Sequence, residues 1–196
     1  MRICCASILL ATVCLAVAST QVQYFRVGAL DPDPERDTRR ALWYSEELKL
    51  LGEPSLWEPT PGQNTESYRF LWLRSFQPDL SVRLDVTGDG TSSLTTKIAR
   101  SKHSRNSGKL KTSHVLQVTK EQTTLFLATI EEHRFCNLPS AHSYRGLDGA
   151  DWIIEGNRGG TYHVIDRWMP KDGDVRAIGF AMVNDLANLN ISTKEN

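Results

Sequence analysis

The chain has 196 residues, and its 23 Lys and Arg residues balance 23 Asp and Glu residues, so the formal net charge is zero. Nucleic-acid-binding domains usually carry a clear basic excess, and the balanced charge therefore argues against that class. The length suffices for one ordinary domain with its own hydrophobic core.

Residues 1–18 have the pattern of an export signal. Arg2 supplies the basic start, residues 3–17 are apolar, and Ala16-Val17-Ala18 has the small-x-small form that signal peptidase reads. A membrane anchor is the alternative, but the apolar run is too short for a membrane-spanning helix. We therefore expect cleavage after Ala18 and a mature protein that is periplasmic or extracellular and has no membrane span.

Cleavage would leave Cys136 as the sole cysteine of the mature chain. We therefore expect no internal disulfide. The simplest interpretation of Cys136 is a small, buried apolar residue, and the alternatives are an intermolecular disulfide or a nucleophilic thiol.

Residues 19–67 are predicted to form an N-terminal extension with one helix and a Pro-rich linker. Asp33 before Pro34 is typical of a helix start, because the carboxylate can cap free amides and proline fits the first helical position. The helix should run to about Leu51, and Gly52 suits its end. The sequence leaves open whether this helix packs on the rest of the protein.

Residues 68–190 are predicted to form the main domain, followed by a tail at 191–196. Residues 68–74 are apolar on both sides, as in a central strand covered on both faces. Residues 82–86 alternate between apolar and polar, as in a strand with one solvent-facing side. A turn at residues 87–90 leads to a third strand at 91–99.

A basic segment, residues 97–111, precedes a fourth strand at 110–118. It contains six Lys and Arg residues and no acidic residue. We interpret it as a solvated loop. The alternative is contact with an anionic surface or polymer, as in an envelope-associated structural protein.

Two further helices are predicted. Thr119 and Gln122 fit a capping box that opens a helix to about Arg134. The last helix begins near Asp172, and its apolar residues follow a helical spacing as far as Leu189. Asn190 begins an N-glycosylation triplet, which matters only in a host that glycosylates. The expected fold class is α+β, with a largely antiparallel sheet of about six strands and helices packed on one face.

Residues 147–168 contain the densest set of chemically capable side chains. Two runs rich in β-branched and aromatic residues flank a Gly-rich break, which predicts a β-hairpin. We prefer a three-residue loop at 157–159, because an even loop would scatter the aromatic residues over both faces. This register places four large side chains on one apolar face: Trp152, Ile154, Tyr162 and Val164.

The same register separates the polar side chains of the hairpin. Glu155 and His163 point away from the apolar face, where they could form an acid–base couple, with Asp151 as a second carboxylate. Asp166 falls on the apolar face, so its carboxylate needs a partner or a raised pKa. Arg74 is one possible partner. A buried structural ion pair is the simpler interpretation of Asp166, and a catalytic acid or ligand anchor is the alternative.

Three segments resemble a group of bacterial exported proteins to which no activity is assigned. They are FLWLR at 70–74, LDGADWIIEG at 147–156 and YHVIDRWMP at 162–170, and the similarity covers roughly residues 68–189. The resemblance implies a single exported domain of bacterial origin. It also draws attention to five residues of these segments: Arg74, Glu155, His163, Asp166 and Arg167.

The five histidines show no paired ligand spacing, and the chain has no phosphate loop, dinucleotide fingerprint or nucleophile elbow. We therefore expect no metal and no cofactor.

The first hypothesis for function is a non-catalytic module that binds an unknown protein or small-molecule ligand. The expected binding residues are Arg74, Arg167, Trp72 and Trp168. The alternative is a small hydrolase-like enzyme that uses Glu155, His163 and Asp166 near Arg74.

Overall fold

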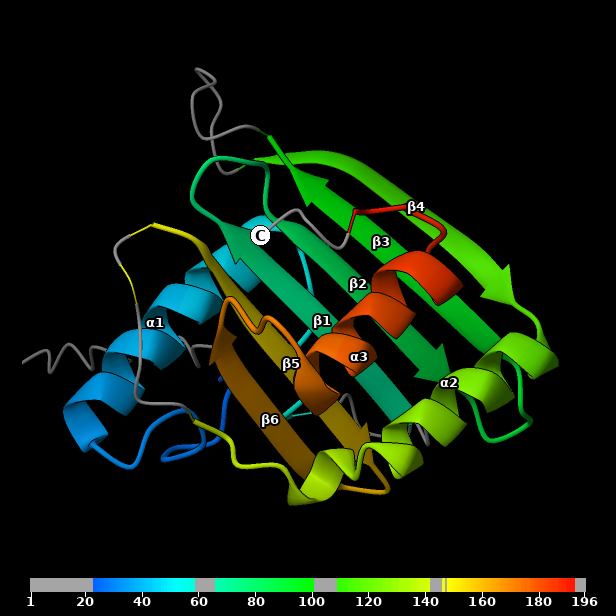
Figure 1. Ribbon diagram of the computed structural model, residues 1–196, viewed down its shortest axis with the longest axis horizontal. Coiled ribbons are helices and arrows are strands. Elements are labelled where there is room, and N and C mark those ends of the chain that lie inside the picture. Colours follow the sequence, from blue (N-terminus) through cyan, green and yellow to red (C-terminus); the bar gives the residue numbers. More distant parts are fainter. Residues whose placement is uncertain (1–22, 59–65, 101–108, 142–145, 147, 193–196) are drawn as a thin grey trace, which may run out of the picture.

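The computed structural model describes residues 23–58, 66–100, 109–141, 146 and 148–192. The predicted export signal and the centre of the basic segment lie outside these residues. Six strands form one antiparallel sheet in the order β4-β3-β2-β1-β5-β6 (Figure 1). Together with three α-helices, this sheet confirms the α+β fold class.

The strands and helices follow one another along the chain in the predicted order: a helix, four strands, a helix, a two-stranded hairpin and a last helix. The strands are β1 (Glu66–Arg74), β2 (Leu80–Val86), β3 (Ser92–Ala99), β4 (Leu110–Val118), β5 (Ala150–Arg158) and β6 (Thr161–Trp168). The helices are α1 (Pro34–Leu50), α2 (Lys120–Glu132) and α3 (Gly173–Phe180), with a 3₁₀ turn at Phe135–Asn137 and a π-helical stretch at Ala181–Leu186.

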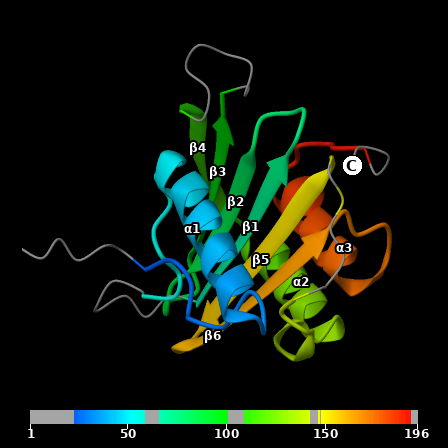
Figure 2. The ribbon, with the colours of Figure 1, turned by 90° about the vertical axis from the view of Figure 1, so that its left-hand side faces the viewer.

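Helices cover both faces of the sheet (Figure 2). Helices α2 and α3 lie on one face, here the α2/α3 face, as the sequence predicts. Helix α1 lies on the opposite face, here the α1 face, whereas the sequence predicted helices on one face and left the packing of this helix open. Each face therefore has its own hydrophobic core.

The first core, between the sheet and α2/α3, is built around Trp152. Its ring lies 4.8 Å from the ring of Phe70 and 5.0 Å from that of Trp72, measured between centroids. Helix α3 approaches this cluster at Gly179, where an added Cβ would lie 2.4 Å from the Trp152 ring. Only glycine allows so close an approach of the helix backbone to the aromatic ring.

The second core joins the N-terminal extension to the sheet. Asp33 caps α1 by accepting a hydrogen bond from Arg36 N at 2.9 Å, as predicted. The helix then buries Tyr44 and Leu48, both 0% exposed, against Leu71 and its neighbours on the α1 face. The extension is therefore packed on the domain, which answers the question that the sequence left open.

The β5–β6 hairpin differs from its predicted register. Its loop has two residues, Gly159 and Gly160, with φ of +57° and +83°, and Arg158 pairs with Thr161 across it. Two adjacent residues with positive φ fit a type I′ turn, whose twist matches that of the strands. The three-residue loop is therefore wrong. The prediction assumed that one face of the hairpin is exposed to solvent, whereas both faces are covered by other parts of the protein.

The shift by one residue sorts the side chains differently between the two faces. Trp152 and Ile154 lie on the α2/α3 face with Ile165 and His163. Tyr162 and Val164 lie on the α1 face instead, where they contribute to the second core.

Cys136 is exposed in the 3₁₀ turn after α2, so its interpretation as a buried residue is wrong. No helix in the described part of the chain is both long and apolar enough to cross a membrane.

Candidate functional site

Glu155, a candidate catalytic residue, forms a buried ion pair on the α1 face. Arg69 donates to its Oε2 atom from Nε at 2.8 Å and from Nη2 at 2.5 Å, and both residues are 0% exposed. Tyr162 donates to the other carboxylate oxygen at 2.9 Å. Arg69 also donates to Pro54 O at 2.6 Å. Both oxygens of Glu155 are thus occupied.

The extension completes this arrangement with a second carboxylate, Glu53, which is 3% exposed. Arg83 donates to its Oε2 at 2.9 Å, and Lys97 Nζ lies 3.1 Å from its Oε1. Lys97 also donates to Gly52 O at 2.6 Å. We call Glu53, Arg69, Arg83, Lys97 and Glu155 the buried ion network. It lies between the sheet and the chain that leaves α1.

The network changes the proton affinities of its members. Burial raises the pKa of Glu155 above its ordinary value, and the opposing effects of Arg69 and Tyr162 do not cancel this rise. Burial alone would lower the pKa of Arg69, but the carboxylates of Glu155 and Glu53 raise it above its ordinary value. Both residues are 0% exposed and bonded to each other, so the pair is a buried structural contact out of reach of a substrate.

Sequence reasoning missed most of this network. Arg69 had a visible signal, because it is a charged residue in the middle of an otherwise apolar central strand. Arg83 alternates with apolar residues and was interpreted as solvent-facing, yet only 15% of its side chain is exposed. Glu53 lies in a loop and gives no local signal that it covers the sheet.

Asp166 belongs to a second buried cluster on the α1 face, and it is 1% exposed. Tyr44 donates to its Oδ2 at 3.0 Å, and Arg40 Nη1 lies 3.4 Å from the same oxygen. Arg40 also pairs with Asp31 at 3.0 Å, and the Tyr44 hydroxyl lies 3.5 Å from Asp151. The need of Asp166 for polar partners was predicted, but its partners come from α1.

Arg74 is not the partner of Asp166. Arg74 lies on the α2/α3 face with Trp72, whereas Asp166 lies on the α1 face. The proposed pairing of Arg74 with Asp166 is therefore wrong, because it placed both residues on one face.

His163 lies on the α2/α3 face, half-buried beside the turn after α2. Its Nε2–H donates to Leu138 O at 3.0 Å, and the ring of Phe135 stands edge-on at 5.1 Å. Burial lowers the pKa of His163 below its ordinary value, and the charges of Arg26 and Arg167 lower it further, against the hydrogen bond to Leu138.

We expect His163 to make the protein less stable as the pH falls below about 6.5, the ordinary histidine pKa. In this range the unfolded chain binds a proton that the folded His163 resists, so the free energy of unfolding falls with pH. His163→Gln should show a smaller loss of unfolding free energy between pH 7 and pH 5 in urea titrations. An equal loss in the variant and the wild type would contradict this assignment.

The three candidate catalytic residues do not form one site. Glu155 and His163 lie on opposite faces of the hairpin, because neighbouring positions of paired strands alternate in direction. Asp166 shares a face with Glu155 but belongs to a different cluster, centred on Tyr44. The acid–base couple of Glu155 and His163 is therefore wrong.

A pocket opens where β1 ends. It has a volume of about 230 Å³ and is lined by Trp72, Arg74, Ser75, Phe76, Gln77, Asp148, Gly149 and Met169. We call it the Arg74 pocket. It lies between the turn that joins β1 and β2, the segment before β5 and the end of β6. These segments lie close together because β2, β1, β5 and β6 are consecutive strands of the sheet.

The guanidinium of Arg74 is held in a fixed position at this pocket. It lies 4.9 Å from the centre of the Trp72 ring, and its Nε donates to Pro78 O at 2.9 Å. Nη1 donates to Gln77 Oε1 at 2.7 Å. Phe76, beside it, is 71% exposed. The pocket thus combines an ordered cation with aromatic and thioether surface.

Gly149 brings the other wall of the Arg74 pocket close. Its φ is +151°, and an added Cβ would lie 2.2 Å from Met169 and 2.6 Å from the ring of Trp168. Trp168, a predicted binding residue, therefore supports this wall. Ser75 Oγ accepts a hydrogen bond from Gly149 N at 3.1 Å, which joins the two walls.

Arg167, a predicted binding residue, does not line the Arg74 pocket and has a structural role instead. Its guanidinium donates to Ser140 O at 3.1 Å and to Pro139 O at 2.5 Å, and so ties the segment after the 3₁₀ turn to β6. Of the basic segment, Lys97 belongs to the buried ion network, and residues 101–108 lie outside the described residues.

Among the described residues, no three His, Cys, Asp or Glu side chains are grouped so that they could hold a metal ion. No family model, curated protein or solved structure matches this chain. The Arg74 pocket must therefore be interpreted from its own chemistry.

Proposed function

We propose that the protein is an exported, non-catalytic binding module whose ligand site is the Arg74 pocket. The observation that carries this proposal is the pocket itself, where Arg74 and Trp72 line one cavity. Both residues were singled out from the sequence, and both lie in a segment that resembles exported bacterial proteins.

Arg74 and Asp148 are the two charged residues of the lining, and the ordered guanidinium of Arg74 favours a small, amphipathic ligand with an anionic group. Binding pockets for drug-sized molecules usually measure about 300–1,000 Å³. At about 230 Å³, the Arg74 pocket suits a small molecule or one side chain of a protein partner. Phe76 and Met169 offer apolar contact, and a guanidinium held in place recognises a carboxylate through charge-assisted hydrogen bonds.

The buried carboxylates support a binding role over the hydrolase alternative. Glu155 and Asp166 are 0% and 1% exposed and already bonded to neighbouring side chains. A general acid or base must lie within hydrogen-bonding reach of the substrate. Neither carboxylate meets this condition while the extension covers the α1 face.

Export is proposed on the pattern of residues 1–18, and the packing of the extension supports it. The first buried residues of the chain that the structure describes are Tyr24 and Phe25, which contribute to the second core. Cleavage after Ala18 would leave every one of these packed residues in the mature protein.

Phenylacetate is expected to bind the Arg74 pocket with a Kd on the order of 1 mM, as for weak fragments that contain few atoms. In ¹H–¹⁵N NMR titrations, its shifts should centre on residues 74–77 and 148–149. Phenethylamine, which has the same ring and the opposite charge, should bind more weakly. Arg74→Gln should remove the preference for phenylacetate, because the neutral amide cannot pair with a carboxylate.

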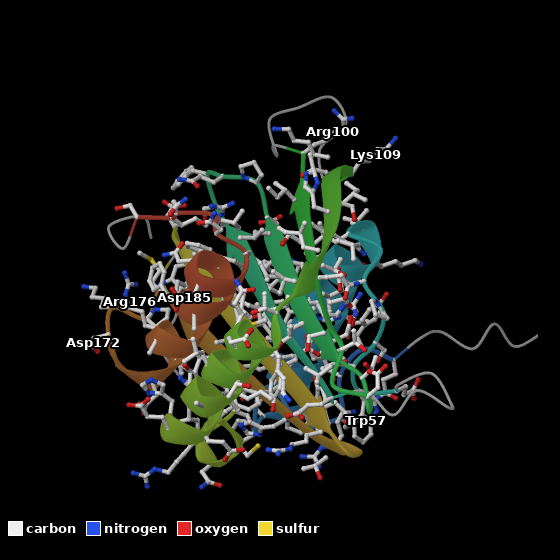
Figure 3. The ribbon with its side chains drawn as sticks, turned by 90° about the vertical axis from the view of Figure 1, so that its right-hand side faces the viewer. Trp57, Arg100, Lys109, Asp172, Arg176 and Asp185 are labelled. Atoms are coloured by element: carbon white, nitrogen blue, oxygen red, sulfur yellow. The ribbon has the colours of Figure 1, made fainter. Side chains whose placement is uncertain are left out.

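The matched control is Arg176→Gln. Arg176 also lies over an aromatic ring, 4.6 Å from the centre of Phe180, but it lies on α3 and does not line the Arg74 pocket (Figure 3). This variant should bind phenylacetate as the wild type does. Equal binding of the two probes, or shifts spread over the surface, would contradict the proposed function.

A further inference from the structure

The two edge strands of the sheet, β6 and β4, differ in how far their outer hydrogen-bonding groups are occupied. At the β6 edge, Asp166 N donates to Ser140 O at 2.7 Å, and Arg167 holds the same segment with its side chain. The segment after α2 therefore occupies hydrogen-bonding groups of this edge strand. The opposite edge is β4, whose one partner in the sheet is β3.

β4 is the outermost strand on its side of the sheet, and this edge of the sheet faces the viewer in Figure 3. It spans nine residues, and most of them are exposed. Val115 is 63% exposed and Leu116 is 56% exposed. Because successive side chains of a strand point to opposite faces, apolar surface is exposed on both sides of β4.

β4 also lacks the devices that usually protect an edge strand. Proteins block such edges with short strands, prolines, bulges or several charged side chains. β4 is long and contains no proline, and Lys111 is its one charged residue. The irregularity in its pairing with β3 lies at Ile98 and Ala99, next to the start of β4. Among the residues that the structure describes, only β3 pairs with the centre of this strand, and its outer edge is open to pairing.

We propose that β4 pairs with β4 of a second copy of this chain in an antiparallel arrangement, so that the two sheets become continuous. A two-fold axis perpendicular to the sheet keeps each residue on its own face, so that odd positions meet odd positions and even positions meet even ones. The axis then passes between a residue at the centre of the strand, His114 or Val115, and the same residue of the second copy.

The sequence of β4 suits such self-pairing. With the axis at His114, Lys111 meets Gln117; with the axis at Val115, it meets Thr119. In both registers the lysine faces a neutral residue, so no like charges are opposed, and like charges directly opposite would be destabilising. Val115 lies at or beside the axis and is covered by its counterpart or by Ser113. The strand can thus pair with a copy of itself without opposing like charges, and this favours a second copy as the partner.

The test is the molar mass of the mature protein in solution, measured by light scattering and sedimentation over a range of concentrations. The full chain has a mass of 22.0 kDa, and the wild type should reach about twice the monomer mass. Val115→Glu and Leu116→Glu place charge at the pairing edge on opposite faces. Each should weaken the dimer at least about tenfold, because each carboxylate lies within two residues of the axis, where it disturbs the contact and approaches the same carboxylate of the second copy.

Two controls make the result specific. Leu125→Glu changes an apolar residue that is 70% exposed on α2, and it should remain dimeric. Cys136→Ser removes the exposed thiol and should also remain dimeric, which separates strand pairing from an intermolecular disulfide. Circular dichroism of each variant should match the wild type.

Three outcomes would overturn the proposal. A wild type that stays monomeric at all concentrations would exclude the dimer. A dimer that survives both glutamate substitutions, or one that is lost in Cys136→Ser, would place the contact elsewhere. None of these outcomes bears on the Arg74 pocket, so the two proposals fail independently.

Discussion

Arg69→Met should lower the free energy of unfolding by about 3–5 kcal/mol, the usual cost of removing one partner from a buried ion pair. The substitution leaves Glu155, which is 0% exposed, with Tyr162 as its remaining bonded partner. A carboxylate cannot be solvated in that position, and methionine offers no compensating charge. Urea denaturation at neutral pH measures the loss.

The pH dependence of the same variant identifies the cause. Without Arg69, the folded pKa of Glu155 rises further above the ordinary glutamate value of about 4.3. A raised folded pKa means that the destabilisation is absent below the ordinary glutamate pKa and grows as the pH rises from there through the folded pKa of Glu155. Arg69→Met should therefore lose less stability at pH 5 than at pH 8. A loss independent of pH would indicate lost packing instead.

Two controls accompany this prediction. Arg158 is exposed and pairs with Glu131 at 2.6 Å and with Glu66 at 3.4 Å, so Arg158→Met should cost less than about 1 kcal/mol.

Arg69→Met combined with Glu155→Leu removes both charges of the buried pair, and Glu53 keeps Arg83 and Lys97 as partners. The double variant should be more stable than Arg69→Met alone, because no uncompensated charge remains.

Leu48→Ala should destabilise the whole domain by about 2–5 kcal/mol, as for other large-to-small substitutions in a core. Leu48 is 0% exposed on α1 and packs in the second core. Leu50→Ala is the matched control, because the same residue type two positions away is 47% exposed. The control should change stability by no more than about 0.5 kcal/mol.

The Leu48→Ala experiment also tests the unity of the domain. Trp72 and Trp152 lie in the first core, on the far side of the sheet from α1. If the extension is part of one cooperative unit, tryptophan fluorescence and circular dichroism should shift together to a lower denaturant midpoint. Separate transitions would show that α1 unfolds alone and that the sheet does not need it.

The sequence predicted the elements whose signals are local. Asp33 and Pro34 define the start of α1, and Thr119 with Gln122 forms the predicted capping box of α2. The strand at 110–118 has the bounds that its pattern indicated. These features depend on residues within one turn of the chain, so a single sequence contains the information for them.

The covering of the α1 face could not be predicted in the same way. Glu53 meets Lys97 and Arg83 after 44 and 30 further residues of chain, respectively. A strand whose polar side contacts such a loop has the same alternating pattern as a strand that faces water. The predicted register of the hairpin was wrong for this reason, because it assumed that one face of the hairpin is exposed to solvent.

The candidate site was predicted in part. Arg74 and Trp72 line a pocket, and Asp166 is buried with polar partners, as its position suggested. Glu155 and His163 were grouped because they are close in the sequence. One residue of register separates them onto opposite faces, and proximity along a hairpin does not determine the face.

The turn at Gly159 and Gly160 has a consequence for how this chain can vary in length. Neither glycine has a neighbouring atom within 4 Å of an added Cβ, so the turn is spatially open and resembles a place where insertions are harmless. Adding one residue there would shift β6 against β5 and turn Asp166 toward the first core, away from Tyr44. The length of this open turn is therefore as constrained as the core beneath it.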